Sequence, residues 1–185
     1  MLLNLGNSVI DIKEFNSNNQ LNECLQKCDL GQIKLGDETD NGSKFYAAII
    51  RPQTLGLHYF GIGICSEGYG LTPHILMLPN SHLMLCGFNS EVVAINVNEQ
   101  KIAFKIHLNS LFYYFLHKPE KQLIIIIQEL DVMAITEDGK ELWNYGKDVI
   151  TQTTINGDNL YLQFIDESSD CLNIFTGQKQ VMMNY

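Results

Sequence analysis

The sequence predicts an all-β protein: an antiparallel meander of short strands with one short helix near the N-terminus. From about residue 82 onward, strand-like segments of five to seven residues, rich in β-branched and aromatic side chains, recur about every ten residues. Asp138-Gly139 and Asn156-Gly157 separate such segments, and these dipeptides favour tight hairpins because they tolerate positive φ. The chain also repeats, since "HLMLCGFNSEVVAIN" (82–96) aligns with "QLIIIIQELDVMAIT" (122–136) at an offset of 40 residues.

The helix is expected in the polar segment that begins at residue 17. Ser17 or Asn18 would cap its start, and Gly31 would end it. The side chains with helical spacing i, i+3, i+4, i+7 are Leu21, Cys24, Leu25 and Cys28. The two cysteines lie on this apolar side, so we interpret them as core residues rather than metal ligands.

Ten strands are expected after the helix-containing region. They cover residues 82–87, 91–96, 101–107, 111–117, 122–128, 131–136, 141–146, 149–155, 159–165 and 171–175. The strand at 111–117, "LFYYFLH", is apolar on both sides, which favours a central position. We expect one domain, with residues 1–80 as a β-rich N-terminal region that carries the helix and residues 81–185 as the repeats.

Each copy of the repeat holds about 40 residues and four short strands, which is the size of a propeller blade. The repeat resembles that of the quinoprotein-type (PQQ-like) β-propellers over about residues 82–181. The family pattern is Ala-x-Asp-x-x-Thr-Gly, with an aromatic residue four positions after the Gly. The matching positions are Ala94, Asn96, Glu99, Gln100 and Phe104 in the first copy, Ala134, Thr136, Gly139 and Trp143 in the second, and Cys171, Asn173, Thr176, Gly177 and Val181 in the third.

In that family the aromatic residue packs between neighbouring blades. The resemblance therefore implies structural roles for Phe104 and Trp143, and for Gly139 and Gly177 at the repeat's glycine position. A closed propeller needs at least four blades, and the chain holds two full copies, a partial third and a degenerate candidate at 41–80. The sequence fits both a minimal four-bladed ring and a stack of sheets, and we favour the stack.

Composition limits the classes of partner. The 185 residues are 45% hydrophobic and 18% charged, as in ordinary globular proteins, and 21 acidic and 12 basic residues give a net charge of −9. No basic cluster is present to neutralise phosphates, so we expect neither nucleic acid nor a membrane surface as partner. An acidic surface suits a basic protein partner instead.

The compartment is predicted from the start of the chain and the cysteines. "MLLNLGNSVIDI" has no signal-peptide pattern, and the most apolar stretch, 122–128, is too short to span a bilayer. The five cysteines form an odd set without a CxxC pair, which favours free thiols in a reducing compartment. We expect a cytoplasmic protein.

No motif predicts a metal, a cofactor or a catalytic residue. The one constellation that carries chemistry is at 65–74, where Cys65, Glu67 and His74 would supply a nucleophile, an orienting carboxylate and a base. A simpler interpretation places Cys65 at a strand end. Tyr69, flanked by Gly68 and Gly70, would then present an aromatic contact at a loop tip.

Our leading hypothesis is a non-enzymatic module that binds another protein as an adaptor, an inhibitor or an oligomer-forming piece. The alternative is a small-molecule binding protein or hydrolase that uses residues 65–74, with contacts at Cys65, Glu67, Tyr69 and His74. A further alternative is a homo-oligomer that pairs through open edge strands.

Overall fold

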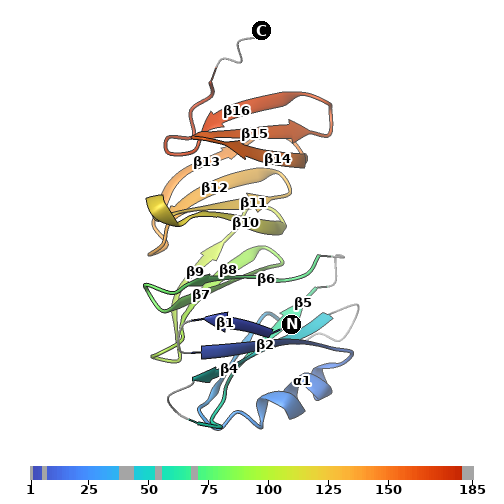
Figure 1. Cartoon of the computed structure of the whole chain (residues 1–185). Helices are drawn as coiled ribbons and strands as arrows, with labels where there is room; N and C mark the ends of the chain where they lie inside the picture. Colours follow the sequence, from blue (N-terminus) through green and yellow to red (C-terminus); the bar gives the residue numbers. More distant parts are fainter. Residues whose placement is uncertain (1, 6–7, 38–43, 53–55, 68–70, 181–185) are drawn as a thin grey trace. The chain divides into compact units, whose positions relative to one another are not determined.

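The computed structural model describes residues 2–5, 8–37, 44–52, 56–67 and 71–180, and it confirms the all-β prediction. The described residues form sixteen strands and one α-helix (Figure 1). The first sheet has the strand order β1-β2-β4-β5-β3, the second β6-β7-β8-β9, the third β10-β11-β12-β13 and the fourth β14-β15-β16. In this part of the chain no sheet closes into a barrel.

The bounds in the first sheet are β1 Leu2–Leu5, β2 Ser8–Phe15, α1 Asn18–Leu25, β3 Gln32–Leu35, β4 Lys44–Pro52 and β5 Phe60–Ser66. Those in the second are β6 His74–Leu78, β7 Leu83–Phe88, β8 Glu91–Asn96 and β9 Lys101–His107. The third holds β10 Phe112–Lys118, β11 Leu123–Gln128, β12 Asp131–Thr136 and β13 Glu141–Gly146, and the fourth β14 Ile150–Asn156, β15 Asn159–Phe164 and β16 Ser169–Asn173. All ten strands expected from residue 82 onward are present, with ends shifted by at most two residues.

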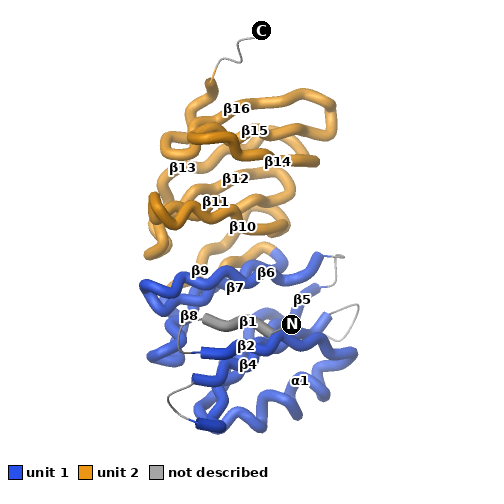
Figure 2. Tube along the Cα trace, in the orientation of Figure 1, with its two compact units in different colours: residues 1–89, 93–103 blue, residues 90–92, 104–185 orange. Residues whose placement is uncertain are grey.

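The chain divides into two compact units (Figure 2). The N-terminal unit comprises residues 1–89 and 93–103, and the C-terminal unit comprises residues 90–92 and 104–185.

Helix α1 begins as the sequence predicts and ends earlier. The Ser17 hydroxyl caps it by accepting a hydrogen bond from the Gln20 N–H at 3.3 Å. The helix stops at Leu25 rather than at Gly31, because the chain then continues in tight turns, in which the Cys28 N–H donates to the Leu25 carbonyl. Cys28 still lies buried, since these turns continue over the same apolar surface.

Glycines in β5 allow α1 to lie close to the first sheet. A Cβ built on Gly61 would be 2.8 Å from the Cys28 Sγ, and one on Gly63 would be 2.7 Å from a Leu25 methyl group. The helix residues Leu21 and Leu25 pack there with Phe45, Ala47 and Cys65. The "GIGIC" pattern is therefore explained by helix packing.

The first sheet differs from a simple meander. Strand β3 pairs with β5 in parallel, which the antiparallel expectation did not include. The connection through α1 carries the chain from β2, past β4 and β5, to the far edge of the sheet, and this route makes the parallel pairing possible.

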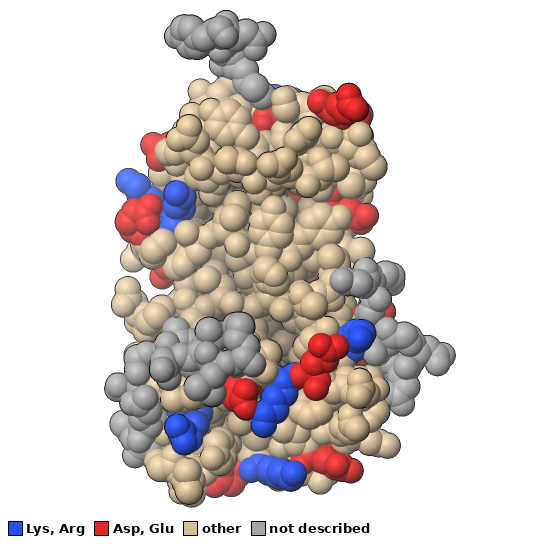
Figure 3. All heavy atoms as spheres, turned by 45° about the vertical axis from the view of Figure 1, so that its right-hand side comes forward, with Lys and Arg blue, Asp and Glu red and all other residues tan. Residues whose placement is uncertain are grey.

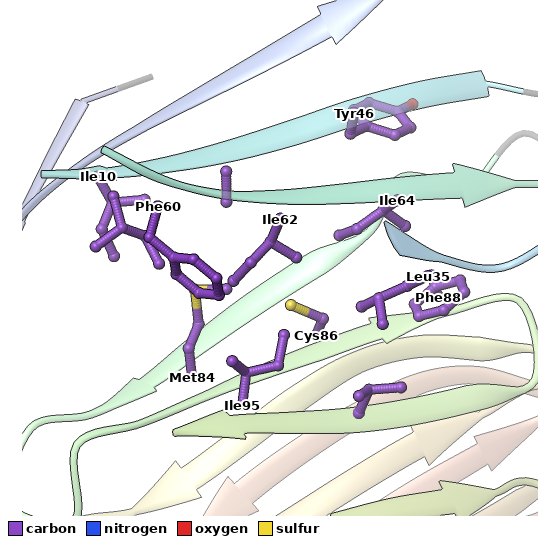
Figure 4. Close-up of a cluster of buried hydrophobic side chains, with 13 residues drawn as sticks. Ile10, Leu35, Tyr46, Phe60, Ile62, Ile64, Met84, Cys86, Phe88 and Ile95 are labelled. Carbon is purple, nitrogen blue, oxygen red and sulfur yellow. The ribbon is translucent and has the colours of Figure 1, made fainter. Parts of the chain in front are cut away.

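The other face of the first sheet forms a core with β7 and β8 (Figure 4). Phe60, Ile62 and Ile64 alternate with the helix-facing residues of β5 and point toward Met84 and Cys86. Both faces of β5 are therefore covered, which explains why every residue of this strand is buried.

The third and fourth sheets share the second main core. It contains the buried side chains of Leu123, Ile125, Ile127, Val132, Ala134, Trp143, Ile150, Leu160, Leu162, Phe164, Leu172 and Ile174. The strand at 111–117 was expected to be central, but β10 lies at an edge of the third sheet and most of its residues are half-buried. Its aromatic side chains are covered by packing across sheets, which a strand's own sequence does not reveal.

Candidate functional site

The repeat positions bring aromatic rings and glycines together in the C-terminal unit. A Cβ built on Gly139 would lie 2.7 Å from the Phe104 ring, and one on Gly177 would lie 2.7 Å from the Trp143 ring. Each aromatic side chain thus lies directly against the glycine of the following copy. The residues at the three equivalent turn positions, Gln100, Gly139 and Gly177, all have positive φ.

Trp143 is held in this position by a hydrogen bond as well as by packing. Its indole N–H donates to the Ile174 carbonyl at 2.9 Å, and the side chain is 8% exposed. A buried indole needs such an acceptor. These contacts agree with the structural role that the resemblance implies for Trp143.

The structure buries the thiol of the 65–74 segment. Cys65 is 1% exposed and its side chain packs with Leu21 and Leu25 of α1. The adjacent Ser66 hydroxyl donates instead to Asn89 at 3.2 Å. A nucleophilic thiol must be accessible, so the buried Cys65 does not favour the hydrolase alternative.

The remaining residues of that segment differ in exposure. Glu67 is exposed, and its backbone N–H donates to Asn89 Oδ1 at 2.9 Å. His74 begins β6 opposite Gly87, and partial desolvation lowers the pKa of its imidazole. Tyr69 lies outside the described residues, so the contact predicted there stays a prediction.

Exposed apolar side chains lie on equivalent turns of the third and fourth sheets. Leu130, in the β11–β12 turn, is 41% exposed, and Ile165, in the β15–β16 turn, is 62% exposed. Both turns lie beside the segment that connects β13 to β14. The Ile150 N–H donates to the Glu129 carbonyl, and the Ile165 N–H donates to the Val149 carbonyl. We call Leu130, Ile165 and the charged side chains around them the turn-edge surface.

Hydrogen bonds hold the Leu130 turn rigidly. The Leu130 N–H donates to the Ser110 hydroxyl at 3.0 Å, and the Glu129 N–H donates to the Leu111 carbonyl at 2.8 Å. Ser110 is in turn fixed by its N–H, which donates to the buried Gln128 side-chain carbonyl at 3.4 Å. Leu130 is therefore presented without the freedom of a mobile loop.

The turn-edge surface is acidic. Its charged residues are Glu129, Asp131, Asp148, Asp166, Glu167 and Lys147, a local net charge of −4. An open hollow of about 640 Å³ lies beside Leu130, lined also by Asp131, Lys147 and Asp148. No local sequence pattern marks this surface, because its residues come from three turns that only the sheet arrangement brings together.

A second hollow lies in the N-terminal unit, beside α1. It measures about 540 Å³ and is lined by Val9, Asp11, Lys13, Cys24, Lys27, Cys28, Ile49, Arg51 and Tyr59. On the face shown in Figure 3, most of the Lys and Arg side chains in view lie close to Asp and Glu side chains. Three basic residues around one pocket therefore stand out in a chain of net charge −9.

The described part of the chain shows neither a metal-binding cluster nor a membrane-spanning helix. There, no three His, Cys, Asp or Glu side chains lie close enough together to hold a metal ion. None of the helices there has the length and hydropathy needed to cross a bilayer.

Comparison with known proteins supports the architecture. No family model matches the sequence, and no curated protein matches it significantly. Sqt1 from Saccharomyces cerevisiae superimposes with a TM-score of 0.50 at 16% identity, over 78% of this chain and 45% of Sqt1. Hydrazine synthase from Kuenenia stuttgartiensis gives a TM-score of 0.52 at 9% identity, over 81% of this chain and 47% of that one.

The fold is propeller-like. At these identities the likeness concerns the fold alone. The chain spans about half the length of these two proteins.

Proposed function

We propose that this protein is a non-enzymatic β module that binds another protein through the turn-edge surface. The observation that carries the proposal is the pair Leu130 and Ile165, two exposed apolar side chains on hydrogen-bonded turns of neighbouring sheets. A few well-packed side chains contribute most of the affinity in a protein interface. Side chains held on hydrogen-bonded turns lose little conformational freedom when they bind.

The surrounding charge indicates the kind of partner. With a local net charge of −4, the surface would attract a segment that presents an apolar side chain among Lys or Arg residues. Complementary charge raises the association rate more than the final affinity, and salt screens it. The partner's association rate should therefore fall as ionic strength rises.

Two finer assignments accompany this proposal. The Phe104–Gly139 and Trp143–Gly177 contacts support a quinoprotein-type repeat within the propeller-like fold. All five cysteines are free, which supports a reducing compartment such as the cytoplasm.

The experiment is quantitative affinity capture at native expression, followed by affinity measurement with the purified candidate. The wild type is compared with Leu130→Asp/Ile165→Asp, and Leu57→Asp is the matched control because Leu57 is 74% exposed in the N-terminal unit. We expect the double variant to bind at least about tenfold more weakly, as for loss of interface hot spots, and the control to bind normally. A partner that binds the double variant as tightly as the wild type, or no partner above background, would refute the proposal.

The oligomer form of the hypothesis needs its own measurement. If edge strands pair two copies, light scattering on the purified chain will give a multiple of the 21.0 kDa chain mass. A strict monomer would exclude this form and leave a different protein as the partner.

A further inference from the structure

The hollow beside α1 results from a short helix on a wide sheet. Eight residues give a helix of about 12 Å, whereas five strands extend about 19 Å from the first to the last. The helix packs mainly on β4 and β5, where Gly61 and Gly63 let it approach closely. The same face of β2 and the end of β4 stay partly uncovered.

The walls of this hollow are apolar. The lining includes Val9 of β2, Ile49 of β4, Cys24, Cys28 and Tyr59. The backbone at Tyr59 is fixed, because its N–H donates to Asp29 Oδ1 at 2.9 Å and its carbonyl accepts from Leu30 at 2.9 Å. The volume of about 540 Å³ lies in the range of small-molecule sites.

The rim is cationic. Lys13 pairs with Asp11 at 3.3 Å, so these two charges largely offset each other. Lys27 and Arg51 form no ion pair or side-chain hydrogen bond with any residue that the structure describes. The four charged lining residues carry a net charge of +2, opposite in sign to the chain's −9.

We propose that this hollow binds a small amphipathic carboxylate, with the hydrocarbon or aromatic body against Val9 and Ile49 and the carboxylate at Lys27 and Arg51. A guanidinium matches a carboxylate with two parallel hydrogen bonds. Partial burial of Arg51 strengthens such a pair relative to one in open water. The apolar walls select against small hydrophilic anions, and the rim selects against neutral and cationic ligands.

The thiols supply a built-in reporter of occupancy. Of the five cysteines, Cys24 alone is not buried, and it lines the hollow. A bound ligand will shield its sulfur, while the other four thiols react slowly in either case. Maleimide labelling of Cys24 therefore localises binding, and Cys24→Ser identifies the labelled site.

The test measures octanoate binding to the purified full chain by calorimetry, with octan-1-ol as the uncharged analogue. We expect saturable one-to-one binding, at least about tenfold slower Cys24 labelling at saturation, and at least about tenfold weaker octanol binding. Lys27→Gln/Arg51→Gln should weaken octanoate binding about tenfold or more. Lys27→Arg, which keeps both charges and the Arg51 guanidinium, should retain most of it, and the remote control Lys105→Gln should have no effect. Circular dichroism confirms that each variant is folded.

Each contrary result overturns the proposal. Absence of octanoate binding up to about 1 mM, or equal affinity for octanol, removes the role of the carboxylate. Binding that leaves Cys24 labelling unchanged places the site elsewhere. Full affinity in the Lys27→Gln/Arg51→Gln variant shows that the rim does not select the ligand.

Discussion

The contact between Trp143 and Gly177 yields a prediction that can be made quantitative. Gly177 has φ +67° and Gly157 has φ +58°. The left-handed backbone should therefore make alanine at either position lower the free energy of unfolding by about 1 kcal/mol. The two positions differ in surroundings: a Cβ on Gly157 meets no atom within 4 Å, whereas one on Gly177 lies 2.7 Å from the indole. Gly157→Ala is therefore a matched control for Gly177→Ala.

The steric term follows from the packing of the ring. Carbon atoms pack best at about 3.5–4.0 Å, so the Trp143 indole must shift by about 1 Å. This shift strains a core and weakens the hydrogen bond to Ile174, and the two effects together cost about 2 kcal/mol. We expect Gly177→Ala to lower the free energy of unfolding by about 3 kcal/mol, against about 1 kcal/mol for Gly157→Ala.

The assay is urea unfolding followed by circular dichroism and by fluorescence. Trp143 is the single tryptophan of the chain, so its emission reports on the C-terminal unit even if the two units unfold separately. In a Trp143→Leu background, where the clash is relieved, Gly177→Ala should cost only the backbone term of about 1 kcal/mol. Equal costs for the two alanine variants in the wild-type background would refute the steric reasoning.

Two further predictions concern titratable groups. Under native conditions at pH 8, Cys24 alone should react quickly with maleimide, whereas all five thiols should react in denaturant. Burial protects the other four and raises the pKa of Cys86 to about 12. Fast labelling of Cys65, checked by peptide mapping, would reopen the nucleophile hypothesis. Burial raises the pKa of Asp170, but the Tyr145 hydroxyl and Lys179 lower it more, so the net pKa lies below its ordinary value. A lowered folded-state pKa stabilises the protein above the unfolded-state pKa, and this stability is lost as the pH falls through the folded-state pKa. Asp170→Asn should therefore lower the free energy of unfolding by about 1 kcal/mol at pH 7, and the difference from wild type should be smaller near pH 3. A difference in urea unfolding that stays constant with pH would contradict this assignment.

Much of the fold is predictable because strands and tight turns are local. The glycines of Asp138-Gly139 and Asn156-Gly157 adopt the positive φ that their turns require. The offset of 40 residues also recurs in the backbone, where His82 and Gln122, one offset apart, share positive φ. Pairings between distant strands, such as β3 with β5, depend on tertiary routing and leave no local pattern.

The candidate sites were less predictable for a related reason. Lys27 and Arg51 are ordinary solvated residues in the sequence, and only the crossing of α1 over β4 places them around one pocket. The pattern at Cys65 was informative in part, since alternation in β5 indicated a strand residue, as the structure shows. Its burial follows from α1, which the strand's own sequence does not specify.

The two proposals can be tested independently, because their residues belong to different units and their local charges are opposite in sign. Lys27→Gln/Arg51→Gln should leave partner capture unchanged, and Leu130→Asp/Ile165→Asp should leave octanoate binding unchanged. If octanoate nevertheless alters partner affinity, linkage requires the partner to alter octanoate affinity by the same factor. Equal factors that differ from one would show that the two sites are coupled, and factors of one would show that they are separate. Unequal factors would show that one of the effects is not equilibrium binding.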